Sequence, residues 1–393
     1  MGDAGVDRAR GGLDERASVR LLSIGTFISN FDRFMVASLL VLIARDLDEP
    51  LEAVAHVATL YFLAYGVMQL IWGVASDRLG RVRTLRLALA IAGLTGVLST
   101  LAPNLELLLV ARTLAGAAFA AAVPTAMVYV GDTVPIERRQ GPLADLMTGG
   151  AVGMAVSTLG AAAVGEYLHW RVAMASTAVI ALYLVFRLRL LAEPEVTERP
   201  SPGTALMRVV RERWALLVLA LGFLEGMVVL GYITFFPTTL QFTGSSATLA
   251  GAVTTAFGVS TIVSARVVKR LDGRLSPARL IGIGAVCAVS AFACALVDQE
   301  VAGMLGASLL LGVGRAFMHS SLQTWVTDVV PDARAMAVGL FATVLFTGSS
   351  AAAAIGGVLM ATGDHRLMYA VALASAVPLG VVATWGRSRY SRR

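Results

Sequence analysis

Charged residues are scarce in this chain of 393 residues: they make up 15% of it, whereas about one quarter is usual for a soluble protein. Lysine is nearly absent, with Lys269 as the single example among abundant arginine, alanine and glycine. The apolar residues stand in long blocks, without helical stripes or strand alternation. These features exclude a soluble protein and indicate a membrane protein with many spans. The composition also suggests a high-GC bacterial genome, and hence a multi-pass protein of the bacterial inner (plasma) membrane.

Cysteine and enzyme motifs are also scarce or missing. Cys287 and Cys294 lie in one apolar block, about 10 Å apart along a helix, which is too far for a disulfide. The sequence has no Walker loop, no paired metal-ligating cysteines and no nucleophile elbow. We therefore expect no enzyme activity, no metal and no cofactor. The net charge of +6 does not indicate nucleic acid, because the basic residues lie between apolar blocks. The polar start, MGDAGVDRARGG, predicts no cleavable signal peptide.

Twelve apolar blocks are long enough to cross a bilayer as α-helices. We expect them at residues 19–44, 53–73, 85–102, 105–130, 143–165, 170–186, 214–240, 248–268, 280–297, 301–326, 336–359 and 367–385. Most of the 32 basic residues then fall on one side, which places both termini in the cytoplasm. The expected fold is an all-α membrane protein with twelve transmembrane helices in two pseudo-symmetric six-helix halves. Its parts are a tail (1–18), the N-terminal half (19–186), a cytoplasmic linker (187–213), the C-terminal half (214–385) and a basic tail (386–393).

The two halves resemble each other in sequence. The motif DTVPIER (132–138) follows the fourth expected span, and DVVPDAR (328–334) follows the tenth. Allowing one residue of slippage, the same register places Asp32 of span 1 opposite Glu225 of span 7. Duplicated halves are typical of secondary transporters that bind substrate at the midplane. Small-molecule substrate, protons and membrane lipid are the expected partners, and the chain is expected to act as a monomer.

The loop after the second span, GVASDRLGRVRTL, resembles the signature of the major facilitator superfamily. The matching residues are Gly73, Asp77, Arg78, Gly80 and Arg81. The resemblance covers nearly the whole chain and implies the major facilitator fold, with this loop as a cytoplasmic gate. It also implies that Asp77 accepts hydrogen bonds from the N-terminus of span 11, where negative charge is favoured. Such a contact would close the cytoplasmic side of the outward-open state.

A second signature lies in span 4, where RTLAG resembles the Arg-x-x-x-Gly motif that is linked to proton transfer in the family. Its arginine is Arg112. Antiporters of the family usually carry Gly-Pro in span 5, where this chain has Ser157 and Thr158. This departure weakens an antiporter assignment without removing it.

Ionisable residues inside the spans usually face a water-filled path or one another. Asp32 and Arg33 are sequence neighbours and point about 100° apart on a helix, so they need not pair. Glu225 has no cation near it on its own helix, and a low-dielectric surrounding favours the neutral form of a lone carboxyl group. We therefore expect Glu225 to be the first candidate for proton coupling and Asp32 the second, with Arg112 beside them. A locally compensated charge or a structural hydrogen bond is the alternative for each.

Polar and aromatic stripes on three spans predict the wall of a substrate cavity. The candidate substrate-binding residues are Arg33, Asn30, Tyr65, Gln69, Tyr232, Arg315, His319 and Gln323. Arg315, His319 and Gln323 recur at every fourth position and share one helix face. The spans contain two acids and three arginines, so one arginine is expected to lack a protein counter-ion and to be available to an anionic substrate.

Four functions fit these residues. The run of spans 1 and 2 resembles drug:proton antiporters of the bacterial twelve-span branch, which favours proton-coupled efflux of drugs or metabolites by alternating access. The Asp-Arg pair in span 1 resembles anion symporters, which favours proton-coupled uptake of an organic anion. A facilitator without ion coupling is the third function. A receptor or scaffold is the fourth, and it would not need buried ionisable groups.

Overall fold

The computed structural model describes residues 13–194, 202–271 and 273–390, so parts of both predicted tails and of the predicted linker lie outside the described residues. The described residues form helices and connecting loops only. Within the described residues, twelve helices or runs of consecutive helical elements are long and apolar enough to cross a membrane, which confirms the predicted all-α fold with twelve spans. Many helices start earlier or end later than the apolar blocks, because polar first and last turns extend them.

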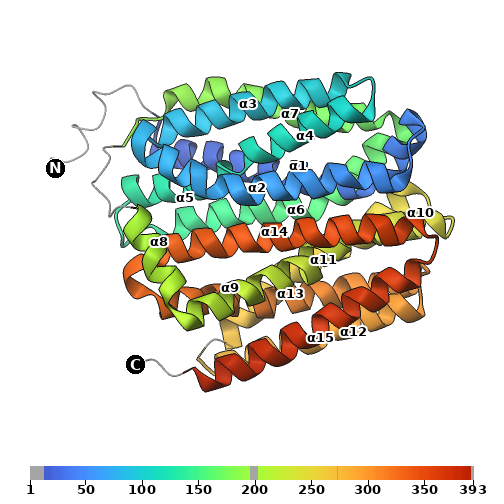
Figure 1. Cartoon of the computed structure of the whole chain (residues 1–393). Coiled ribbons are helices and arrows are strands. Elements are labelled where there is room, and N and C mark those ends of the chain that lie inside the picture. The colour runs from blue at the N-terminus through green and yellow to red at the C-terminus, as the bar shows by residue number, and fades with distance from the viewer. Residues whose placement is uncertain (1–12, 195–201, 272, 391–393) are drawn as a thin grey trace.

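The first six spans form the upper, blue-to-green half of Figure 1. Their elements are α1 (Glu15–Leu47), α2 (Leu51–Leu79), α3 (Arg81–Leu101), α4 (Leu105–Phe119), α5 (Ala122–Thr133), α6 (Gln140–Tyr167) and α7 (Trp170–Arg187), followed by the short η2 (Leu188–Leu190). Helix α8 (Pro202–Arg211) then lies inside the segment predicted as a linker. It packs on α14 and η5 at the end of the bundle where α1 begins and α15 ends (Figure 1). We call this the termini end, and the opposite one the far end.

The last six spans form the yellow-to-red half (Figure 1). Their elements are α9 (Arg213–Glu225), η3 (Gly226–Gly231), η4 (Tyr232–Phe235), α10 (Phe236–Phe242), α11 (Ala247–Leu271), α12 (Pro277–Val297), α13 (Val301–Val329), η5 (Pro331–Ala333), α14 (Arg334–Ala361) and α15 (His365–Arg389).

The fourth span is broken between α4 and α5, whereas the sequence predicts one continuous helix. Pro124 lies in the first turn of α5 and lacks the N–H that would continue the helical ladder. Side chains from other spans bind the nearby carbonyl groups: the Ser29 hydroxyl donates to Phe119 O at 3.1 Å and the Trp72 indole donates to Ala117 O at 2.7 Å. The break is therefore held in place by α1 and α2.

The seventh span is interrupted by a turn of π-helix, η3, and a turn of 3₁₀-helix, η4. Close packing on α14 accompanies the interruption: a Cβ at Gly226 would lie 1.8 Å from Leu345 O, and a Cβ at Gly348 would lie 1.9 Å from Phe223 O. Only glycine permits this approach. Turns of π-helix are frequent at functional sites, and Glu225 is the last residue before η3.

The two halves meet along two helix pairs, α2 with α14 and α6 with α11, and α1 also contacts η4 and α10. Among the described residues, four hydrogen bonds cross the boundary. The hydroxyls of Thr343 and Ser350 donate to the carbonyls of Gly66 and Thr59, at 3.0 and 2.8 Å. The hydroxyls of Thr158 and Thr255 lie 2.9 Å apart, and Thr248 N donates to Glu166 at 2.6 Å. The candidate site lies between these helix pairs.

Candidate functional site

Asp32 is the centre of a buried network within the first half. Its carboxylate accepts two hydrogen bonds from Arg112, at 2.7 and 3.0 Å, and Arg112 also donates to its carbonyl oxygen at 3.2 Å. Tyr61 and Thr177 donate to the same carboxylate at 2.9 and 2.8 Å. Both charged side chains are buried. The network joins α1, α2, α4 and α7, so it brings together two of the three predicted proton-coupling residues and fixes four helices to each other.

Arg33, the next residue along α1, has quite different surroundings. Its guanidinium lies 4.8–5.0 Å from the ring centroids of Phe34, Tyr65 and Phe346. Its Nη2 donates to Asn30 Oδ1, while its buried Nε has no hydrogen-bond partner among the residues that the structure describes. The sequence leaves open whether Asp32 and Arg33 pair, and in the structure Asp32 pairs with Arg112 instead. Three predicted substrate-binding residues, Arg33, Asn30 and Tyr65, are thereby brought together.

Glu225 is fully buried in the second half and has one hydrogen-bond partner among the described residues. His319 Nδ1 of α13 lies 3.1 Å from Glu225 Oε1, and Oε2 is buried without a partner. The imidazole side chain is 24% exposed, and its ring centroid lies 5.9 Å from that of Phe341. Sequence reasoning named both residues but did not predict their contact, because it joins positions 94 apart in the chain.

Arg315 lies one helical turn before His319 on the same face of α13. It is close enough to interact electrostatically with Glu225 and with Arg33 of the other half. Its Nη1 is buried and has no hydrogen-bond partner in the described part of the chain. Arg315 thus interacts with a charged group in each half.

The remaining predicted substrate-binding residues are placed less centrally. Gln69 is half-buried and Gln323 is exposed, and neither side chain has a hydrogen bond within residues 13–194, 202–271 and 273–390. Tyr232 is fully buried, and its ring packs edge-on against Phe292 of α12, 6.2 Å between centroids. Glu225 and Tyr232 do not share one continuous α-helical face, because the π-turn between them changes the helical register.

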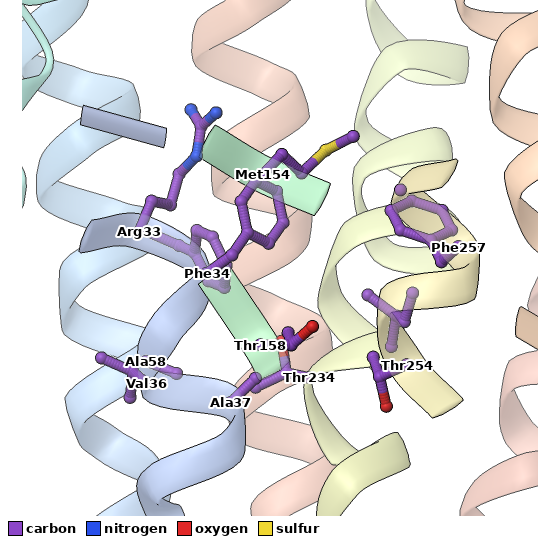
Figure 2. A pocket seen from close by; sticks show the side chains of 13 residues that line it. Arg33, Phe34, Val36, Ala37, Ala58, Met154, Thr158, Thr234, Thr254 and Phe257 are labelled. Atoms are coloured by element: carbon purple, nitrogen blue, oxygen red, sulfur yellow. The ribbon is translucent and has the colours of Figure 1, made fainter. Parts of the chain in front are cut away.

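A small cavity lies between the halves beside Arg33. Its volume is about 20 Å³, room for about one water molecule. Apolar side chains dominate its wall, which is contributed by α1, α2, α6, η4 and α11. Figure 2 shows the Arg33 guanidinium on the same side as Met154, with the threonines Thr158, Thr234 and Thr254 at the other side. Sequence reasoning did not assign these threonines to a cavity, because single hydroxyls in apolar spans carry little signal.

The loop predicted as a gate forms a charge cluster around Arg81, whose side chain is only 1% exposed. Its guanidinium binds Asp77 at 2.6 Å and Asp132 at 2.9 Å. Gly73 and Arg78 are exposed on the surface of α2. The expected contact of Asp77 with the first turn of α14 stays a prediction.

Gly80 shows why the loop needs glycine at this position. It has a positive φ of 97°, and a Cβ on it would lie 2.6 Å from the carboxylate of Glu193. That carboxylate accepts hydrogen bonds from the backbone N–H groups of Val82 and Arg83, at 3.0 and 3.1 Å, and so caps the start of α3. Glu193 was not singled out from the sequence, because it lies more than one hundred residues from the loop.

Two six-helix halves with ionisable groups buried near their boundary define a polytopic membrane transporter. A family model described as the Major Facilitator Superfamily matches residues 22–297 and 236–393. The chain therefore belongs to the Major Facilitator Superfamily, whose members are transporters and not enzymes.

Two relatives illustrate the range of similar sequences. An uncharacterized MFS-type transporter, YybF, of Bacillus subtilis (strain 168) is 24% identical over 313 residues, which are 77% of this chain and 76% of that protein. A triacylglyceride transporter of Mycolicibacterium hassiacum is 28% identical over 204 residues, 51% of this chain and 37% of that protein.

Solved structures share the fold at low identity. A bacterial homologue of the human lysosomal transporter Spinster has a TM-score of 0.79 at 16% identity, covering 97% of this chain and 100% of its own. A D-xylose-proton symporter has a TM-score of 0.78 at 14% identity, with 94% and 97% covered. The nucleoside transporter NupG has a TM-score of 0.77 at 15% identity, with 95% and 100% covered. These likenesses show the major facilitator fold, as the sequence predicts.

Proposed function

We propose that this protein is a proton-coupled secondary active transporter that moves a small organic molecule by alternating access. The observation that carries the proposal is the Glu225–His319 pair. The carboxylate is fully buried with one oxygen unpartnered, and the imidazole beside it is partly exposed. A buried carboxylate with an unsatisfied oxygen is costly in its charged form. A proton that arrives through His319 would remove this cost.

Asp32 supports the proposal by contrast. Arg112, Tyr61 and Thr177 together supply its carboxylate with four hydrogen bonds. Hydrogen bonds and an opposite charge both favour the ionised form. We therefore assign proton exchange to Glu225 and a structural role to the Asp32–Arg112 pair, with a single chain as the working unit because the cavity lies within it.

The direction of transport has two candidates. Efflux of drugs or metabolites by antiport follows from the resemblance of spans 1 and 2 to drug:proton antiporters. Uptake of an organic anion with a proton is favoured by Arg33, which has no carboxylate within ion-pair distance among the described residues. The arginine-rich termini end is the proposed cytoplasmic face of a bacterial inner membrane.

Vesicle transport with an imposed pH gradient tests the proposal. Purified protein in proteoliposomes would be offered ethidium, a cationic drug, and benzenesulfonate, an anion whose charge is independent of pH in this range. Proton-driven antiport predicts ethidium movement against the proton flux, and proton-driven symport predicts benzenesulfonate accumulation on the alkaline side. Equal fluxes of both probes with and without the gradient would contradict proton coupling.

A further inference from the structure

The buried charges of the spans do not balance within the protein. Asp32 and Arg112 neutralise each other in the first half. In the second half Glu225 faces both His319 and Arg315. Arg33 remains, and none of the described carboxylates lies within 4.0 Å of it. With Glu225 ionised and His319 neutral, the group of Arg33, Arg315 and Glu225 carries one net positive charge.

Aromatic rings hold the Arg33 side chain without using its hydrogen-bond donors. Phe34 and Tyr65 come from the first half, and Phe346 comes from α14 of the second half. Contacts of this kind stabilise a cation. The guanidinium has five N–H donors, of which Nη2 donates to Asn30 Oδ1. The unpartnered Nε shows that this donor capacity is not used up by the protein.

The cavity beside Arg33 has a mostly apolar wall. Phe62, Phe257 and Ile233 contribute to its wall, and Thr234 and Thr254 place hydroxyls at the side away from the guanidinium (Figure 2). It now has room for about one water molecule. Because its wall comes from both halves, a relative movement of the halves changes its size.

We propose that Arg33 binds the anionic head of the transported substrate, and that the substrate is an organic monoanion with an aromatic or branched apolar body. This inference rests on the proposed transport function. The single net charge favours a monoanion over a phosphate dianion. A carboxylate or sulfonate would accept hydrogen bonds from the planar guanidinium, and the buried Nη1 of Arg315 supplies a second donor on the facing half.

Equilibrium binding to purified protein tests the assignment without a pH gradient. The probes share one ring and differ in charge: benzenesulfonate, neutral benzenesulfonamide and cationic phenyltrimethylammonium. We expect the wild type to bind benzenesulfonate most tightly of the three. Charge-assisted hydrogen bonds contribute about 1.5–3 kcal/mol, so Arg33→Gln should weaken benzenesulfonate binding roughly tenfold to a hundredfold.

Two further variants make the result interpretable. Arg366→Gln removes an exposed arginine at the far end and should leave binding unchanged. Arg33→Lys keeps the charge but loses the planar donor geometry, so it should bind the sulfonate several-fold more weakly than the wild type. If Arg33→Gln does not fold, the affinity of Arg33→Lys tests the assignment in its place. Equal affinity of wild type and folded Arg33 variants, or a wild type that prefers the neutral or cationic ring, would overturn the assignment.

The binding and transport results separate the two proposals. Arg33-dependent binding without proton-driven transport would sustain the substrate class and refute the proton coupling. Proton-driven transport of ethidium, with no Arg33-dependent anion binding, would sustain the proton coupling and refute the substrate class.

Discussion

Asp32 and Glu225 show how two buried carboxylates in one membrane protein differ through their neighbours. Both side chains are fully buried, so depth does not distinguish them. Asp32 accepts hydrogen bonds from three side chains, including a bidentate arginine, whereas Glu225 has one oxygen near His319 and one without a partner. We therefore expect substitutions at Asp32 to affect mainly stability and substitutions at Glu225 to affect mainly coupling.

Glu225→Gln should abolish gradient-driven accumulation of the transported probe while binding persists. Glutamine fills the same space but cannot exchange a proton, so the pH gradient can no longer drive the cycle. Accumulation in proteoliposomes and equilibrium binding measure the two effects separately. Glu106→Gln, which changes an exposed acid near the far end, is the control. Uphill transport by Glu225→Gln at the wild-type rate would refute this role.

Asp32→Asn should lower stability by about 3–5 kcal/mol, because it leaves the buried Arg112 guanidinium without a counter-ion. Thermal unfolding in detergent measures the change. Thr177→Val removes one neutral donor to the same carboxylate and should cost only about 1 kcal/mol. An Asp32→Asn protein that unfolds at the wild-type temperature would show that the pair is dispensable for the fold.

At the scale of helices, the sequence was sufficient to predict the twelve spans but not the breaks within them. Hydrophobic blocks predict twelve crossings because length and apolarity alone set them. The break in span 4 and the π-turn after Glu225 were both missed from the sequence, and the π-turn depends on α14 approaching Gly226, a contact between distant positions. The Asp32–Arg112 bond, between positions 80 apart, likewise required the rotation of two helices to be known.

Gly226→Ala should destabilise the seventh span, because the added methyl would meet Leu345 O at 1.8 Å and α14 would have to move away. Gly282→Ala is the matched control in another span, since its methyl would lie 3.6 Å from Thr384. Alanine is the better helix former by up to about 1 kcal/mol, so the control should be neutral or slightly more stable. Unfolding temperatures of the two variants in one detergent check this, and similar values would contradict the tight packing.

At the scale of the whole molecule, transport requires the two halves to separate where they now touch. The hydroxyls of Thr158 and Thr255 are 2.9 Å apart on α6 and α11, so paired cysteines at these positions should form a disulfide. In a background lacking Cys287 and Cys294, oxidation of the double cysteine variant should stop transport, and reduction should restore it. The two single cysteine variants, treated identically, are the controls. Undiminished transport by the oxidised protein would mean that this contact persists throughout the cycle.

The hydroxyl of Thr343 bears on how fast such a cycle can run. Its single proton is shared between Gly66 O of the other half and Gly339 O of its own helix, both at 3.0 Å. When α2 moves away from α14, the hydroxyl of Thr343 keeps its hydrogen bond to Gly339 O, so the donor still has an acceptor. A buried donor left without an acceptor would add about 1–3 kcal/mol to the free-energy barrier for separating the halves. Since about 1.4 kcal/mol in an activation barrier changes a rate tenfold, this shared proton lets the halves part with little loss of turnover.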